Sequence, residues 1–458
     1  TWTVPGGSLR TTTFAAGAPG SDYAIVRYDY RNASRRPQDV QLVVGVRPFQ
    51  VNPPTQFLNG SGGVAAVREL AWDGRSLRIN GQIDVTPLTT PKLFTAARFD
   101  VAPTPQEWLA QSQPVTRLVD DAGPASGAFV YRQKVAAGAS VTVAFVVPWT
   151  APSLDLPKPA ATTAWLEARQ REVAAGWHAT LDRVSLHGPA EAQPLIDMIR
   201  SSLAHILINR DGPSLQPGSR SYERAWIRDG AMISEALLRT DHAPVAREFL
   251  DWYSGYLFSN GKVPCCVDHR GADSVPENDS SGEYLWLVDR LDRYTQDRAA
   301  RDRVWPKVTL AFGYLDQLRR SERTPEVLAS ADRAFYGMMP ASISHEGYFA
   351  KPMHSYWDDF WTLAGLRSAV RLARERDDGP ALERSDAALQ EFRADLAASL
   401  AATIEQHKID YLPGCAELGD FDATSSTVAL TPAGESNRLP QAVLQRTFEK
   451  YWENFVAR

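Results

Sequence analysis

The chain has 458 residues, 49 of them basic and 54 acidic, which gives a formal net charge of −5. This length favours two or three domains, each large enough to bury its own core. The charge balance excludes a general basic surface for nucleic acid, and no run of lysines and arginines supplies one locally. No apolar stretch approaches the ~20 residues of a membrane span, so we expect a soluble protein.

The sequence begins with Thr1 rather than Met, and no signal peptide follows. We therefore expect a trimmed N-terminus, which leaves the cellular compartment undetermined. Residues 1–155 are predicted as β structure, because short β-branched and aromatic runs such as 24–30, 40–46 and 141–147 alternate with turn residues. Such a pattern, with no helical segment between the strands, favours an antiparallel β-sandwich.

A proline-rich segment at 148–159 suggests a domain boundary, and the hydrophobic period then becomes helical. Residues 156–189 are predicted as a helical linker, centred on a helix at 164–181. Within 190–458, further helices are expected at about 191–209, 242–258, 282–297, 302–320, 358–376, 384–406 and 438–456, besides the one that follows Asp229. No fixed-period repeat accompanies them, so paired antiparallel helices in a closed α/α barrel are favoured over a solenoid.

Three loops between these helices carry chemically rich segments. The first contains Trp226, Arg228 and Asp229 just before a helix. One interpretation makes Asp229 a helix cap with Arg228 as its surface partner. The other gives these residues a sugar site, in which the indole stacks, the guanidinium donates and the carboxylate accepts.

The second loop runs from about 261 to 284 and contains Asp279 and Glu283. Polar residues at 278–281 are good helix caps, and Ser280 with Glu283 fits a capping box. Capping accounts for one or two of these groups but not for a loop of this length, which is more often functional.

The third loop contains Trp357, Asp358 and Asp359 among further aromatic residues. In one interpretation, the two carboxylates interact favourably with the partial positive charge at the N-terminus of a helix and have no further role. Alternatively, a carboxyl group beside tryptophans loses water, which raises its pKa toward that of a general acid. A fourth segment around Asp422 is interpreted as a turn or a helix cap.

The three cysteines, Cys265, Cys266 and Cys415, are too few for a disulfide framework and lack the CxxC spacing of a zinc site. They are interpreted as buried or half-buried thiols. No metal site is expected.

Together, the loop segments resemble the (α/α)6-barrel glycoside hydrolases of the glucoamylase type, glycoside hydrolase family 15, within the six-hairpin glycosidase superfamily. Residues 226–231 resemble the family's Trp-x-Arg-Asp substrate-binding segment, and residues 357–359 resemble its Trp-Glu-Glu segment, whose first carboxylate is the general acid. Residues 278–283 resemble the segment before the fourth barrel helix. The resemblance covers residues from about 190 to the end, and bacterial members also carry an N-terminal β-sandwich.

The resemblance implies a β-sandwich (1–155), a helical linker (156–189) and an (α/α)6-barrel catalytic domain (190–458). It implies an inverting glycosidase with Asp358 and Asp359 as catalytic carboxylates. Its substrate-binding residues would be Trp226, Arg228, Asp229, Asp279, Glu283 and Trp357. The expected partner is a carbohydrate, with no metal or organic cofactor, no nucleic acid and no membrane.

Two departures from the family pattern affect this prediction. A complete barrel needs twelve helices, whereas about eight or nine are counted, so the late helices are expected to be missing or carried on another polypeptide segment. The family's general base, a late Glu, is not recognised here, and Glu417 and Glu435 are weak candidates. Three alternatives stay open: a phosphorylase of the same fold, a polysaccharide lyase using residues such as His345, and a non-catalytic glycan-binding protein.

Overall fold

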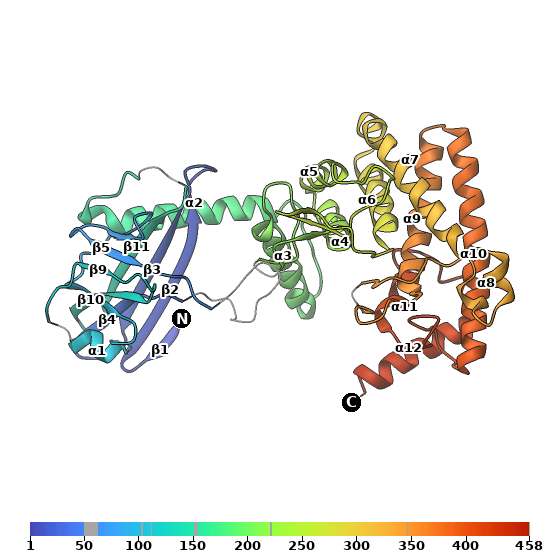
Figure 1. Cartoon of the computed structure of the whole chain (residues 1–458). Helices are drawn as coiled ribbons and strands as arrows, with labels where there is room; N and C mark the ends of the chain where they lie inside the picture. Colours follow the sequence, from blue (N-terminus) through green and yellow to red (C-terminus); the bar gives the residue numbers. More distant parts are fainter. Residues whose placement is uncertain are drawn as a thin grey trace. The chain divides into compact units, whose positions relative to one another are not determined.

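The computed structural model describes residues 1–49, 63–101, 104–110, 112–150, 154–219, 222–345 and 347–457. Residues 151–153 of the proline-rich segment therefore lie outside the described part. The chain divides into two compact units, Thr1–Asp182 and Arg183–Arg458 (Figure 1). Within the described ranges, none of the helices has both the length and the apolar character that a membrane crossing requires.

The first unit is built from two antiparallel sheets. The larger has the strand order β1-β2-β3-β11-β7-β6-β5-β9, and the smaller has the order β4-β10-β8. The strands of the larger sheet are β1 (Trp2–Val4), β2 (Gly7–Ala16), β3 (Tyr23–Asn32), β5 (Glu69–Trp72), β6 (Leu77–Ile79), β7 (Ile83–Pro87), β9 (Arg117–Val119) and β11 (Ser140–Pro148). Those of the smaller are β4 (Gln38–Val46), β8 (Leu93–Arg98) and β10 (Ala125–Val135). A short helix, α1 (Pro105–Ala110), lies beside β4 and β10.

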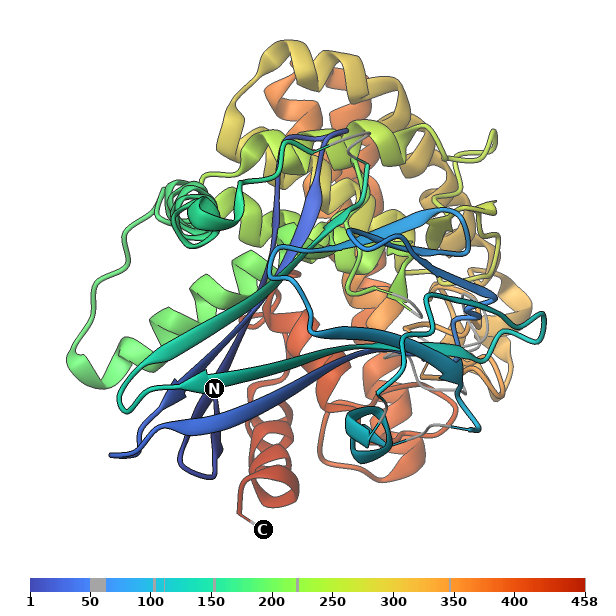
Figure 2. The ribbon, with the colours of Figure 1, turned by 90° about the vertical axis from the view of Figure 1, so that its left-hand side faces the viewer.

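Alternation along β11 explains how this unit is layered. Val143 and Phe145 point into the core between the two sheets, where Phe145 contacts Phe129 of β10 at a ring distance of 5.2 Å. Ala144 and Val146 point to the opposite face and pack with Leu166 of α2 (Thr162–Leu181). Both faces of the strand are therefore buried, as its nearly continuous apolar sequence requires. Figure 2 shows α2 end-on beside the long strands.

The second unit is helical. Its longer helices are α3 (Gln193–Asn209), α4 (Ile227–Arg239), α5 (Ala243–Ser254), α6 (Ser280–Thr295), α7 (Arg298–Ser321), α9 (Tyr356–Glu375), α10 (Gly379–His407), α11 (Ala423–Leu430) and α12 (Gln441–Phe455). The short α8 (Pro325–Ala329) brings the described α-helices of this unit to ten. The predicted β plus α/α architecture is confirmed.

Four of these helices form an inner row. Contacts link α4 to α6, α6 to α9, and α9 to α11, while α5, α7, α10 and α12 pack outside them. The inner helices α6 and α9 are buried along most of their length. Their N-terminal ends lie together and so do their C-terminal ends, since Asp279 contacts Trp357 and Asp289 contacts Arg371. The two helices therefore run parallel.

A small sheet, which the sequence pattern did not predict, lies within the helical unit. Its strands are β12 (Ala225–Trp226), β13 (Cys266–Asp268) and β14 (Gly271–Ala272). Strands of two or three residues are too short to show alternation. The sheet joins the first and second functional loops, so it fixes their relative positions.

The close approach of α6 and α9 depends on glycine. A Cβ added at Gly282 would lie 2.2 Å from the carbonyl oxygen of Trp361. We expect Gly282→Ala to lower the free energy of unfolding by about 1–3 kcal/mol, because the two backbones must separate. Gly313→Ala on α7 is the matched control: its Cβ would meet nothing within 4 Å, so the same change should stabilise by about 0.5–1 kcal/mol. Urea unfolding of both variants checks this, and equal effects would contradict it.

Candidate active site

The functional loops converge at the N-terminal ends of three inner helices, α4, α6 and α9. Arg228, in the first turn of α4, lies 3.6 Å from the carboxylate of Asp279, which immediately precedes α6. The indole nitrogen of Trp357, in the first turn of α9, donates a hydrogen bond to Asp279 at 2.7 Å. Asp279 therefore joins all three loops. Helix N-termini carry partial positive charge, so this arrangement favours the carboxylates gathered there.

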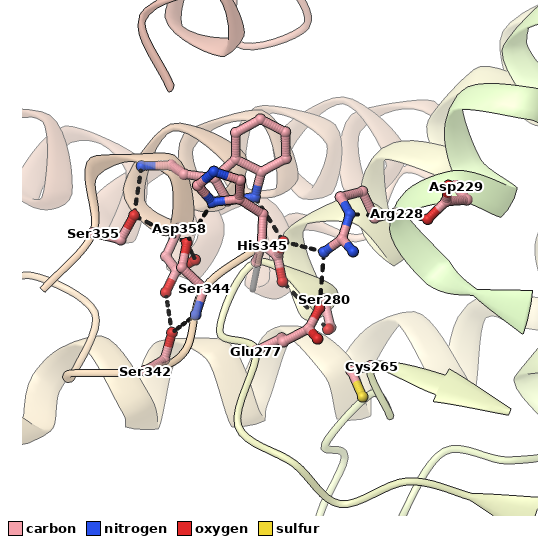
Figure 3. Close-up of polar contacts among 12 residues, drawn as sticks. Arg228, Asp229, Cys265, Glu277, Ser280, Ser342, Ser344, His345, Ser355 and Asp358 are labelled. Atoms are coloured by element: carbon pink, nitrogen blue, oxygen red, sulfur yellow. Dashed lines mark hydrogen bonds and ion pairs between the residues drawn. The ribbon is translucent and has the colours of Figure 1, made fainter. Parts of the chain in front are cut away.

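Asp358 lies at the centre of this region and is fully buried. Ser342 donates to one of its carboxyl oxygens at 2.6 Å, and Ser344 donates to the other at 2.9 Å (Figure 3). Burial and the nearby charge of Asp279 raise the pKa of Asp358 well above its ordinary value, against the opposite effect of the two serines. A carboxyl group with a raised pKa holds its proton more strongly, which suits the role of a general acid.

The backbone that presents Ser344 is unusual. Ser344 has a φ of +54°, in the left-handed region that residues other than glycine rarely adopt. Its amide donates to the hydroxyl of Ser342 at 2.7 Å, which holds the turn closed. Strained backbone of this kind persists where the surrounding structure determines it, often at functional sites.

Arg228 is the cation of the site. Its guanidinium pairs with Glu277 at 2.8 Å and lies within 4 Å of Asp279 and Asp229. Burial alone would lower its pKa, but the surrounding carboxylates, Asp279 and Glu283 first among them, raise it above the ordinary value. Arg228 is therefore permanently charged and compensates a cluster of acidic groups, one of which, Asp229, keeps 31% of its side chain exposed.

Glu283 lies one helical turn into α6 and is fully buried. Among the described residues, neither of its carboxyl oxygens has a hydrogen-bond partner. Burial raises its pKa well above the ordinary value, and Asp279 adds to the effect while Arg228 opposes it. Glu283 therefore holds its proton more strongly than an exposed glutamate does.

Asp359 faces away from this group. One of its carboxyl oxygens accepts from the amide of Met339 at 3.0 Å, and the other has no partner among the described residues. Burial raises the pKa of Asp359 to about 8. Consecutive helical residues point about 100° apart, so Asp359 supports the loop at Met339 while Asp358 contacts the serines.

These raised pKa values predict how stability depends on pH. Asp359 changes from an ordinary 3.8 to about 8 on folding, so between these values the folded state binds protons that the unfolded state has lost. The free energy of unfolding should therefore fall as pH rises from about 4 to about 8. Urea unfolding across this range should show a shallower slope in the double variant Asp359→Asn/Glu283→Gln than in the parent. An unchanged slope would contradict this explanation.

Aromatic rings border the site. Trp357 stacks on His345, with ring centroids 4.6 Å apart. The second nitrogen of His345 lies 3.7 Å from Asp422, which also caps α11. Trp226 is 5% exposed and packs against Arg224 and Tyr222.

The capping alternatives proposed from the sequence do not describe these acidic residues. Trp226, not Asp229, occupies the N-cap position of α4. Asp279 is the N-cap of α6 but makes no capping hydrogen bond with its side chain. Its carboxylate instead accepts a hydrogen bond from Trp357 and pairs with Arg228. By contrast, Asp422 does cap α11, accepting from the amide of Thr424 at 2.9 Å.

Four residues of the site were not among the predicted site residues: Glu277, Ser342, Ser344 and His345. Glu277 lies in the second loop, immediately before residues 278–283, the segment that resembles the family. His345 was noted only as a residue for the lyase alternative. The serines gave no sequence signal, because a serine in a loop is common and its partner Asp358 lies 14 or more residues away.

The two carboxylates suggested as a general base are engaged elsewhere. Glu417 accepts from both the amide and the imidazole of His354, the latter at 2.7 Å. Glu435 pairs with Arg393 at 2.6 Å. Neither has a contact with Asp358 among the described residues.

One group of side chains has the composition of a metal site. The thiols of Cys265 and Cys266 and the carboxylate of Asp273 lie within 4.8 Å of one another. However, Asp273 pairs with Arg224 at 2.8 Å. The contact with Cys266, together with burial, raises the pKa of Cys265. Metal binding needs thiolates, so this set fits a metal poorly.

Comparisons with known proteins place this geometry in context. No protein-family model matches the sequence, and no curated protein matches it significantly. A solved structure of a bacterial glucoamylase complexed with acarbose matches with a TM-score of 0.58 and 12% identity, over 91% of this chain and 59% of that one. The fold is therefore glucoamylase-like. The resemblance predicted from the loop motifs is confirmed at the level of the fold, and this chain spans 59% of that glucoamylase's length.

Two rhamnosidases give weaker matches. A rhamnosidase from Klebsiella oxytoca with rhamnose bound has a TM-score of 0.43 and 12% identity, covering 92% of this chain and 80% of that one. An α-L-rhamnosidase from Dictyoglumus thermophilum has a TM-score of 0.43 and 11% identity, covering 99% of this chain and 43% of that one.

Proposed function

We propose that this chain provides the active site of a glycoside hydrolase, with Asp358 as its general acid. The observation that carries the proposal is the environment of Asp358: it is fully buried, hydrogen-bonded through both oxygens, and raised in pKa at the N-terminus of an inner helix. The glucoamylase-like fold supports it.

The other site residues have roles that follow from their chemistry. Arg228 and Asp229 offer a forked donor and an acceptor for sugar hydroxyls. Asp279 positions the indole of Trp357, whose face offers a wall to a sugar ring. Glu283 is a buried hydrogen-bonding group, and Trp226 supports the first loop. Asp359 acts through the loop at Met339.

The reaction we propose proceeds with inversion. Asp358 protonates the leaving glycosidic oxygen while a second carboxylate activates water on the opposite face of the sugar. An inverting pair leaves roughly 6.5–9.5 Å between the two carboxyl groups for that water. The chemistry needs neither a metal ion nor an organic cofactor.

Product analysis tests the proposal. The chain is incubated with a panel of oligosaccharides and 4-nitrophenyl glycosides, with and without inorganic phosphate, and the first-formed product is examined by proton nuclear magnetic resonance. We expect phosphate-independent hydrolysis that releases a sugar of inverted anomeric configuration. A retained configuration would contradict the inverting mechanism but not the proposed hydrolase activity. Sugar phosphates would indicate a phosphorylase, unsaturated sugars a lyase, and binding without turnover a glycan-binding protein, and each of these would refute the hydrolase.

A further inference from the structure

A polar cavity lies toward the C-terminal ends of the inner helices α6 and α9. Its volume is about 240 Å³, and α6, α9 and α10 supply most of its lining. From Asp358 to Arg371, α9 advances thirteen residues, which is on the order of 20 Å, so this cavity is separate from the candidate active site. Six arginines line it, and we call it the arginine pocket: Arg290, Arg293, Arg367, Arg371, Arg374 and Arg393.

Positive charge exceeds negative charge around this pocket. Among the described residues that line the pocket, Asp289 is the only acidic one, and it already contacts three of the arginines. The other carboxylates that pair with the lining arginines are Asp292, Glu375 and Glu435. Two of these carboxylates have a further partner outside the pocket, since Arg301 pairs with Asp292 and Arg438 pairs with Glu435. In the described ranges, seven guanidinium groups therefore share four carboxylates, in a chain whose overall charge is −5.

Individual arginines show that this excess is not compensated by the described residues. The Nε atom of Arg290 is buried and has no hydrogen-bond partner among them. Arg374 has no ion pair with any residue in the described ranges. Burial lowers the pKa of Arg367, and the charges of Arg393, Arg438 and Arg290 lower it further, against the effect of Glu435.

Helix dipoles account for only part of the cluster. Arg293 and Arg374 lie in the last turns of α6 and α9, where a cation interacts favourably with the helix C-terminus. Arg290, Arg367 and Arg371 lie earlier in these helices, and Arg393 lies in the middle of α10. Their convergence on one cavity needs another explanation.

We propose that the arginine pocket binds a small oxyanion of the phosphate or sulfate class. Guanidinium groups present planar, forked donors that match the oxygens of such an anion and bind it through charge-assisted hydrogen bonds. The cavity equals roughly eight times the ~30 Å³ that one water occupies in the liquid, which leaves room for a free anion or for the phosphate of a monoester. The proposal is independent of the proposed glycosidase activity.

Isothermal titration calorimetry of the whole chain tests the proposal, with inorganic phosphate, sulfate and glucose 6-phosphate as probes and chloride at matched ionic strength as the reference. We expect saturable binding of phosphate or sulfate that chloride does not reproduce. If glucose 6-phosphate binds more tightly than inorganic phosphate, the natural ligand is a phosphomonoester; equal affinity indicates the free anion. If none of the three binds better than chloride, the proposal is wrong.

Two variants locate the binding site. Arg374→Gln removes a lining cation without leaving a carboxylate unpaired, and Arg367→Gln removes one that is crowded by like charges. Each should weaken phosphate affinity roughly tenfold, as expected for the loss of charge-assisted hydrogen bonds. Arg384→Gln is the matched control, because Arg384 is exposed on α10 and does not line this pocket. Phosphate binding that survives both pocket variants, or that falls equally in the control, would overturn the assignment.

Discussion

Replacing Asp358 by Asn is expected to reduce turnover by about 10²–10⁴-fold, because the amide cannot supply the proton that the leaving oxygen needs. The loss should be largest for glycosides with poor leaving groups. It should be smaller for 4-nitrophenyl glycosides, because 4-nitrophenolate is a good leaving group that needs little protonation. The fold should survive. The hydroxyls of Ser342 and Ser344 can rotate to accept from the new amide nitrogen as well as donate to its oxygen.

Asp386→Asn provides the matched control for this result. Asp386 is an exposed carboxylate on α10, away from the three loops, so the same chemical change there should leave turnover unaltered. Steady-state kinetics on both variants, with circular dichroism to confirm folding, gives the comparison. Activity of Asp358→Asn within about threefold of the parent would refute the general-acid assignment, since removing a transition-state interaction must lower kcat.

Replacing Arg228 by Ala is expected to lower the free energy of unfolding by about 3–5 kcal/mol at neutral pH, the usual cost of leaving buried charge unpaired. The guanidinium is the cation that Glu277 and Asp279 contact, and both of these carboxylates are buried.

Arg228→Lys separates charge from geometry. The ammonium group keeps the positive charge but lacks the planar fork that spans two partners, so we expect a smaller loss of stability together with weakened sugar binding. Urea unfolding and calorimetry with the best substrate of the panel measure the two effects. If Arg228→Ala is as stable as the parent at neutral pH, the guanidinium does not stabilise the buried carboxylates of Glu277 and Asp279, and the prediction is wrong.

Most of the secondary structure followed from sequence periodicity. The helix expected at 358–376 is α9 at Tyr356–Glu375, and the one expected at 191–209 is α3 at Gln193–Asn209. These segments are long and strongly patterned, so their hydrophobic period identifies them. The five-residue α8 and the strands β12 to β14 were not predicted, because they are too short for a period to appear.

The site was only partly predictable from the sequence. Trp357, Asp358 and Asp279 lie together as the motifs suggested, because helix N-termini bring short motifs to one end of a barrel. Asp359, next to Asp358 in the sequence, faces a different partner, since neighbouring helical positions point in different directions. The hydrogen bonds from Ser342 and Ser344 join separate loops, and no local pattern encodes them.

The crystal structure of the Asp358→Asn variant soaked with a cleavable oligosaccharide tests the central claim most directly. Asp358 is fully buried in the free chain, so the complex shows whether a sugar reaches this position. We predict a glycosidic oxygen about 2.6–3.2 Å from the side chain of residue 358, with hydroxyls of the adjacent sugar on Arg228 and Asp229. A sugar bound elsewhere, with residue 358 still enclosed by Ser342 and Ser344, would contradict the account.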